Sequence, residues 1–218
     1  TESEVVTQII YGESFSISQK KNQWLKIKIK EDNYKGYIQS KNYSEYLKPT
    51  HKINKLNAKI YKFSNTQLKI NELTFGSKIK VTNKKSQFYK FAKGWISKHD
   101  VSTISFKEKN LFRKINIFKN IKYKWGGKSF KGIDCSALIQ VCLNFNNTYC
   151  PRDAKDQFKY FKKNIRLKKI KKNDIIFWKN HVAVALNSKK LIHAYGPMKK
   201  TVIMEIDRTI KRIDKTAS

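Results

Sequence analysis

The chain has 218 residues, a formal net charge of +32 at pH 7, 39% hydrophobic residues and 13% aromatic residues. This apolar content can build hydrophobic cores, which excludes an intrinsically disordered chain, and the length allows one large domain or two to three small ones. No apolar run approaches the roughly 18 residues of a membrane helix, and the N-terminus lacks the layout of a secretory signal. We therefore expect no membrane span, and the compartment stays open between the cytoplasm and the periplasm or cell envelope.

Lysine supplies almost all of the positive charge, with 43 Lys against 5 Arg spread over every segment. Because arginine is the usual reader of bases and phosphates, we expect no specific nucleic-acid partner. The pattern favours lysines on solvated faces, as an AT-rich genome would encode. Weak, salt-sensitive contact with anionic wall polymers would follow from the same charge.

An internal repeat organises the first hundred residues: residues 12–17, 23–27 and 36–38 recur in the same order as 76–81, 87–91 and 94–96. The last pair has a shorter offset, so the first copy carries a few extra residues around 28–35. Each copy alternates apolar and polar residues over short runs, which predicts half-buried strands. The order of Gly, aromatic and Ile positions resembles bacterial SH3-like domains, which predicts two small β-barrels at 1–50 and 51–107.

A different pattern begins near residue 109. Residues 111–122 are predicted to form a helix, because Leu111, Ile115 and Phe118 fall at i, i+4 and i+7. A glycine-containing turn follows. A second helix is predicted from residue 136 onward, where four apolar residues fall at i, i+3, i+4 and i+7, namely Leu138, Val141, Cys142 and Phe145.

Cys135 lies at the predicted start of this second helix. Unpaired backbone N–H groups and the helix dipole stabilise an anion there and lower the pKa of a thiol, which favours a nucleophile. A buried structural cysteine lies more naturally in mid-helix, as Cys142 does. With Cys150 the cysteines are odd in number and lack metal-ligand spacing, so we expect no disulfide framework, no metal and no cofactor.

Two histidines lie in short strand-like runs downstream. In residues 181–186, His181 shares a strand face with the small residues Ala183 and Ala185, which leave room for a helix. If the next run pairs back through an odd-length loop such as 187–189, Ala183 opposes His193 and His181 is its diagonal neighbour on the same face. An even-length loop would place the two imidazoles on opposite faces. The odd register therefore predicts a line of Cys135, His181 and His193, which are a nucleophile, its base and an orienting group.

Six motifs follow one another along residues 109–207: Tyr123-x-Trp125-Gly126-Gly127, Gly132-x-Asp134-Cys135-Ser136, Pro151-Arg152-x-Ala154-x-x-Gln157, Asp174-x-x-Phe177, His181-Val182 and Ile192-His193-Ala194. In content and order they resemble NlpC/P60 family cysteine peptidases. Ala137 and Asn173 stand where that family usually has Gly. Alanine suits a helix at least as well, and asparagine tolerates left-handed turns, so neither change removes a chemical group.

The resemblance implies an α+β fold, in which a papain-like NlpC/P60 catalytic domain (108–218) packs its helices on an antiparallel sheet behind the two SH3-like barrels. Family members with tandem SH3-like domains resemble γ-D-glutamyl-L-diamino acid endopeptidases, which implies a murein peptide substrate. It also implies that Cys135 attacks the γ-D-Glu carbonyl, that His181 takes and returns the proton, and that His193 orients His181.

The same resemblance implies a set of substrate contacts. Tyr123 and Asp134 match positions tied to substrate recognition, and Ser136, Arg152 and Asp153 would lie on the D-Glu side, although Asp153 could equally cap a helix. A free L-Ala amine needs a further acid from the first SH3-like module. Glu13 is favoured by its Tyr-Gly-Glu context, with Glu31 and Asp32 as alternatives.

Two other functions remain open from the sequence. The chain could be a non-catalytic relative that binds wall polymer or another polyanion through its basic SH3-like domains. It could also keep the fold and act as an amidase or acyltransferase.

Overall fold

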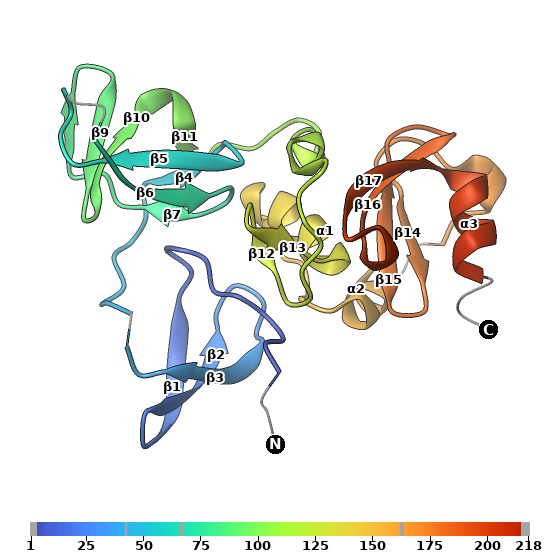
Figure 1. The fold of residues 1–218 in the computed structure, drawn as a ribbon, viewed down its shortest axis with the longest axis horizontal. Coiled ribbons are helices and arrows are strands. Elements are labelled where there is room, and N and C mark those ends of the chain that lie inside the picture. Colours follow the sequence, from blue (N-terminus) through green and yellow to red (C-terminus); the bar gives the residue numbers. More distant parts are fainter. Residues whose placement is uncertain (1–3, 42, 66–67, 162–163, 215–218) are drawn as a thin grey trace. The chain divides into compact units, whose positions relative to one another are not determined.

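The computed structural model describes residues 4–41, 43–65, 68–161 and 164–214. The chain forms two compact units: one is Ile9–Phe106, and the other joins Lys107–Ser218 to the residues up to Gln8 (Figure 1). The predicted start of the catalytic domain at 108 lies next to the boundary between the units. The division of the N-terminal unit at residue 50 stays a prediction. Within the described part of the chain, no helix is long and apolar enough to cross a membrane.

The N-terminal unit begins with an antiparallel sheet of β1 (Phe15–Lys21), β2 (Trp24–Ile29) and β3 (Lys35–Gln39), in the order β1-β2-β3. The strict alternation predicted for β2 is confirmed, since Leu25, Ile27 and Ile29 are buried and their neighbours are exposed. The extra residues of the first copy lengthen the β2–β3 hairpin. Its turn contains Asn33 in the left-handed conformation, with φ of 63°.

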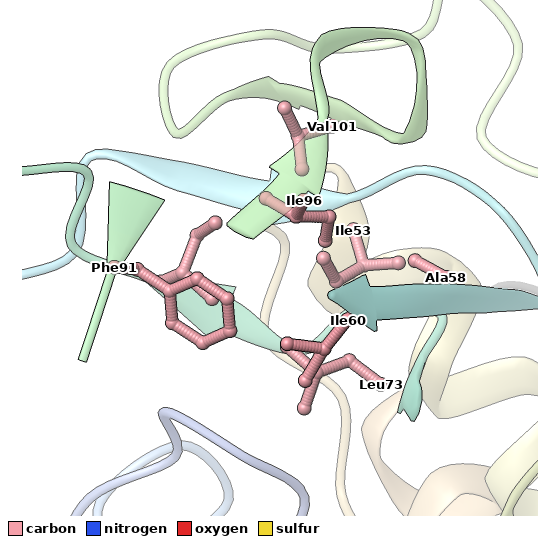
Figure 2. Close-up of a cluster of buried hydrophobic side chains, with 8 residues drawn as sticks. Ile53, Ala58, Ile60, Leu73, Phe91, Ile96 and Val101 are labelled. Atoms are coloured by element: carbon pink, nitrogen blue, oxygen red, sulfur yellow. The ribbon is translucent and has the colours of Figure 1, made fainter. Parts of the chain in front are cut away.

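Eight further strands lie among the described residues of this unit: β4 (His51–Ile53), β5 (Asn57–Tyr61), β6 (Lys69–Thr74), β7 (Lys78–Ile79), β8 (Asn83–Lys85), β9 (Phe88–Phe91), β10 (Gly94–Ser97) and β11 (Val101–Thr103). They pair in two sheets, β6-β5-β10-β9-β8 and β11-β4-β7, and a short 3-10 helix η1 (Lys98–Asp100) precedes β11. One buried cluster lies between them (Figure 2), consisting of Ile53, Ala58, Ile60, Leu73, Ile79, Phe91, Ile96 and Val101. Short strands around a single apolar cluster are what the second repeat predicts.

The C-terminal unit is α+β, as predicted. It contains a small hairpin of β12 (Lys128–Ser129) and β13 (Gly132–Ile133), followed by α1 (Cys135–Phe145) and α2 (Ala154–Tyr160). A four-stranded antiparallel sheet follows, in the order β14 (Ile175–Trp178), β15 (His181–Ala185), β16 (Lys190–Tyr195) and β17 (Lys200–Glu205). Helix α3 (Ile206–Asp214) begins directly after β17, and the 3-10 helices η3 (Leu167–Lys169) and η4 (Gly196–Met198) lie in the connections.

The helix predicted at 111–122 is wrong. The segment forms turns and one short 3-10 helix, η2 (Ile115–Phe118). Phe112, Ile115 and Phe118 are buried, whereas Leu111 is exposed. Their spacing of three residues matches the 3.0-residue turn of a 3-10 helix rather than the 3.6-residue turn of an α-helix, so the segment lies on the core without forming α-helical turns.

Helix α1 and helix α3 lie on opposite sides of the C-terminal sheet (Figure 1). Helix α1, which contacts β15 and β16, is buried at every position from Cys135 to Leu143. Ala183 and Ala185 pack with Ile206 of α3. The small residues beside His181 therefore leave room for a helix, as the sequence predicts, and that helix is α3.

Candidate active site

Asp134 caps the helix that carries the candidate nucleophile. Its backbone is extended, and its Oδ1 accepts a hydrogen bond of 2.8 Å from the N–H of Ala137, which is one of the unpaired donors of the first turn of α1. Cys135 is thereby the first helical residue, as the sequence predicts. Ala137 is fully buried in this turn, so the alanine that replaces the usual glycine is accommodated.

Arg152 fixes the Asp134 cap in place through hydrogen bonds. Its guanidinium donates to both carboxylate oxygens of Asp134, through Nη1 at 3.0 Å and Nη2 at 2.5 Å, and Nη1 also donates to Ser136 Oγ at 2.9 Å. Its Nε donates to Thr7 Oγ1 at 2.8 Å. Planar, two-point pairing of this kind is specific to arginine. The residues Asp134, Ser136 and Arg152, predicted as substrate contacts, thus form one buried network behind the nucleophile.

The motif that contains Arg152 has a second residue that fixes the first turn of α1. Gln157 in α2 donates through Nε2 to the carbonyl oxygens of Ser136 and Pro151, each at 2.9 Å. Asp153 occupies the N-cap position of α2 without a side-chain capping hydrogen bond, so its role, as substrate contact or helix cap, stays a prediction. The start of α2 is therefore connected to the first turn of α1 through the motif residues Pro151, Arg152 and Gln157.

The first described residues of the chain pack against the turn before β12. Gly126 has φ of +68°, and a Cβ there would lie 2.4 Å from the carbonyl oxygen of Val5. Gln8 Oε1 accepts a hydrogen bond of 2.8 Å from the N–H of Lys128. Together with Thr7, these contacts explain why the first described residues belong to the C-terminal unit.

The thiol of Cys135 is almost fully buried, with an exposed fraction of 5%. Burial raises its pKa to about 11, and the charge of Asp134 adds to the rise, whereas hydrogen bonds from the backbone of Val182 and Ser136 and the charge of Arg152 lower it. The lowered pKa expected from the helix start alone is therefore wrong, because desolvation outweighs the N-terminal field. Cys135 is therefore a thiol at neutral pH. Its bond to Val182 places it beside the residue that follows His181.

The strand register brings the two histidines together. Val184 pairs with Ile192 and Ala185 with Leu191, which is the odd-loop register, and it places His181 and His193 on one face. His181 Nε2 lies 2.8 Å from His193 Nδ1. The shared face predicted from strand parity is thus confirmed. Asn173, which replaces a usual glycine before Asp174, has φ of 75° and takes the left-handed conformation expected of it.

Aromatic rings enclose the histidine pair. His193 is fully buried and stacks on Tyr195 at 4.7 Å between ring centroids, and Trp178 lies against His181 at 5.7 Å. Burial lowers the pKa of His181 to about 4 and, with the charge of His181, lowers that of His193 to about 3. Both imidazoles are therefore neutral at neutral pH, and one of them can accept a proton.

Tyr123 lies close enough to Cys135 for the two side chains to interact electrostatically. Its backbone N–H donates to the carbonyl of Lys199 at 2.8 Å, which fixes the residue beside the start of β17. Burial raises the pKa of its phenol to about 12, and negative charge at Cys135 and Asp134 adds to the rise. The phenol keeps its proton at neutral pH and can donate a hydrogen bond.

The acids considered for amine recognition belong to the N-terminal unit, where each has contacts of its own. Glu31 accepts from the N–H of Ser14 at 3.0 Å and pairs with Lys78 at 3.1 Å. Glu13 accepts from the N–H of Ile10 at 2.9 Å, and Asp32 from the N–H of Tyr34 at 3.0 Å. Their role in substrate binding stays a prediction.

Sequence reasoning missed three residues that contact the site. Thr7 completes the donors of Arg152, and Tyr195 stacks on His193. Met204 Sδ lies 3.3 Å from His193 Nε2. No local pattern marks them, because each is brought to the site by pairing with a segment elsewhere in the chain. Among the described residues, no group of three His, Cys, Asp or Glu side chains is arranged to hold a metal ion.

Two family models match the chain. The NlpC/P60 family model matches residues 120–212, which include α1 and all four strands of the C-terminal sheet. The model described as the bacterial dipeptidyl-peptidase SH3 domain matches residues 1–42, which include β1 to β3. The site built from Cys135, His181 and His193 thus lies inside the first match.

Relatives and a solved structure extend this similarity. A gamma-D-glutamyl-L-lysine dipeptidyl-peptidase of Bacillus subtilis (strain 168) is 25% identical over 237 residues, covering 96% of this chain and 79% of that protein. Dipeptidyl-peptidase 6 of Lysinibacillus sphaericus is 32% identical over 99 residues, covering 45% of this chain and 36% of that protein. A crystal structure of an NlpC/P60 family protein from Bacillus cereus ATCC 10987 superposes with a TM-score of 0.78 at 20% identity, covering 92% of this chain and 76% of that one. The last similarity shows the fold.

Proposed function

We propose that this chain, which carries an NlpC/P60 domain and a bacterial SH3 domain, is a cysteine peptidase of cell-wall peptides that cleaves the bond between γ-D-Glu and an L-diamino acid. The nucleophile is Cys135, the base is His181 and the orienting residue is His193. The similarity to an enzyme named gamma-D-glutamyl-L-lysine dipeptidyl-peptidase supports the choice of bond.

One observation carries the proposal. The Cys135 thiol, at the start of α1, is hydrogen-bonded to the backbone of Val182, while the preceding residue, His181, lies 2.8 Å from His193. The contact with Val182, the neighbour of His181 in β15, and the paired imidazoles support the assignment of Cys135 as nucleophile, His181 as base and His193 as orienting group. Burying two polar imidazoles costs desolvation that an apolar pair would avoid, so their presence favours a catalytic role over that of an inert binding domain.

The chemistry follows from the resting protonation states. As Cys135 Sγ attacks the γ-carbonyl carbon, its proton passes to His181, and an S–C bond forms while the carbonyl oxygen becomes an oxyanion. The C–N bond then breaks, and the diamino acid leaves with the proton returned by His181. Water hydrolyses the thioester and regenerates the thiol. We propose the backbone N–H of Cys135 and the phenol of Tyr123 as donors to the oxyanion.

The buried network supports an indirect role for one predicted substrate contact, Arg152. Arg152 is 2% exposed, and its donors are directed to Asp134, Ser136 and Thr7. We therefore assign Arg152 to fixing Ser136 and Asp134 at the D-Glu side. Tyr123 and Asp134 remain our candidates for contact with the substrate beside the nucleophile.

Digestion of L-Ala-γ-D-Glu-L-Lys and its diaminopimelate counterpart, followed by mass spectrometry, tests the proposal. The wild type should release L-Ala-D-Glu, and Cys135→Ala should release none. Cys142→Ala is the matched control, because that cysteine is buried in the middle of the same helix. The α-linked isomer should be cut far more slowly. Absence of cleavage by the wild type, or full activity of Cys135→Ala, contradicts the proposal.

A free L-Ala amine is the finer part of the specificity proposal. N-acetylation of the substrate should abolish cleavage if an acid binds the ammonium, and Glu13→Gln should raise KM for the free peptide only. Glu31→Gln and Asp32→Asn test the two alternatives. Glu72→Gln, which removes a surface acid paired with Lys69, is the control. Equal cleavage of both peptides points instead to an amidase or acyltransferase that does not read the amine.

The N-terminal unit favours an accessory contact with anionic wall polymer. Lys84 and Lys98 lie over the ring of Tyr89, and Lys90 lies over Trp95 on the other face of the β9–β10 pair, so each of these aromatic residues has a cation beside it. Sedimentation with purified cell wall should fall as salt rises, and it should fall further when all three lysines are changed to Gln. Binding that does not respond to either change contradicts this contact.

A further inference from the structure

We propose that Met204 is a positioning residue that holds the two imidazoles in the one tautomeric arrangement in which His181 can act as the base. The inference rests on the proposed function for its consequence in catalysis. Its structural content, the position of the protons on His193 and His181, can be measured without substrate.

The geometry comes from the β16–β17 pair. His193 lies opposite Val202, and Met204 is two residues further along β17, so its side chain lies on the same face of the sheet. Met204 Sδ is 3.3 Å from His193 Nε2, and His181 Nε2 is 2.8 Å from His193 Nδ1. Among the described residues, these two groups are the hydrogen-bond partners of the His193 ring. Each nitrogen of that ring thus faces a different group.

The chemistry of the two partners assigns the protons. A thioether sulfur has no hydrogen to give, so a hydrogen bond at this distance requires that His193 Nε2 carry the proton. Because burial lowers the pKa of both histidines, His193 is neutral and its Nδ1 has only a lone pair. His193 Nδ1 must then accept the proton of His181 Nε2. The remaining nitrogen of His181, Nδ1, is left unprotonated and can accept the thiol proton.

The opposite arrangement would disable the base. If His193 Nδ1 donated to His181 Nε2, His181 would carry its proton on Nδ1, and its one basic lone pair, on Nε2, would be held by His193 and not be free to accept the thiol proton. Met204 opposes that arrangement, because the Nε2 lone pair of His193 would then face the lone pairs of the sulfur. Leucine at this position would fill a similar volume without making the distinction.

The first test reads the tautomers directly. Long-range proton–nitrogen correlation spectra of the histidine-labelled protein, recorded without substrate, should show His193 protonated on Nε2 and His181 protonated on Nε2. In Met204→Leu the Nδ1-protonated form of His193 should gain population, and in Met204→Gln the amide oxygen should restore the wild-type pattern. Met198→Leu, at the other methionine, is the matched control, because that side chain is exposed. A wild-type spectrum with His193 protonated on Nδ1 overturns the inference.

Kinetics give the second test. Met204→Leu should lower kcat by about three- to tenfold with little change in KM, which is the effect of losing one buried hydrogen bond, and Met204→Gln should recover most of the rate. Unchanged kcat and an unchanged spectrum in Met204→Leu overturn the inference. If the wild type shows the expected tautomers but cleaves no peptide, the proposed function fails while the assignment of Met204 stands.

Discussion

Arg152 and Asp134 form a two-point ion pair in which both side chains are buried, at 2.5 and 3.0 Å. The same carboxylate caps α1 at the N–H of Ala137. The arginine therefore fixes the residue that precedes Cys135, and the helix start, the cap and the ion pair form one unit.

Arg152→Ala should destabilise the C-terminal unit strongly. It leaves the Asp134 carboxylate buried without a partner, which typically costs about 3–5 kcal/mol. Arg208→Ala is the control, because Arg208 pairs with Glu205 at 3.0 Å on the surface and such pairs contribute about 1 kcal/mol or less. Urea unfolding of the two variants measures the difference. Equal midpoints for both variants contradict the assigned role.

The reactivity of Cys135 should depend on pH as that of a buried thiol does. Because its pKa is raised to about 11, the thiolate fraction should grow about tenfold per pH unit between neutral pH and about pH 10. Iodoacetamide labelling with peptide mapping measures the rate at Cys135 and separates it from Cys142 and Cys150. A rate that is already at its plateau at neutral pH would indicate a resting thiolate instead.

Gly126→Ala should disturb the packing of the N-terminal residues. Its φ of +68° is unfavourable for alanine, and the new Cβ would lie 2.4 Å from the carbonyl oxygen of Val5. We expect a loss of about 1–3 kcal/mol or more, seen as earlier unfolding and faster amide exchange near Thr7. Gly36→Ala is the control, since nothing lies within 4 Å of a Cβ there. Comparable losses in the two variants would be inconsistent with this contact.

The two histidines should differ in their effect on catalysis. His181→Ala removes the base and should lower kcat by about 10²–10⁴-fold. His193→Ala keeps the base, His181, but removes the residue that orients it. The loss of kcat should therefore be smaller, about 10²-fold or below. His99→Ala, at an exposed histidine of the N-terminal unit, should leave the rate unchanged. Steady-state rates on L-Ala-γ-D-Glu-L-Lys measure all three, and a larger loss in His193→Ala than in His181→Ala would reverse the assigned roles.

The sequence predicted correctly those elements whose apolar spacing can be recognised within a single segment. The α1 stripe of Leu138, Val141, Cys142 and Phe145 produced a helix, and parity placed His181 and His193 on one face, because the periods of helix and strand follow from backbone geometry alone. The motif residues around Arg152 also met at the start of α1. The wrong helix prediction at 111–122 also came from local spacing, since three-residue and four-residue spacings are difficult to distinguish over two turns.

The sequence by itself determined that a cysteine begins a buried helix, and that two imidazoles share a strand face if the loop between their strands has an odd length, which the observed register supplies. Only the tertiary structure decided that Cys135 rests as a thiol, that α3 covers the alanines beside His181, and that Met204 meets His193. The physical reason is that desolvation and side-chain contact depend on which distant segments pack together. No period within a single segment carries that information.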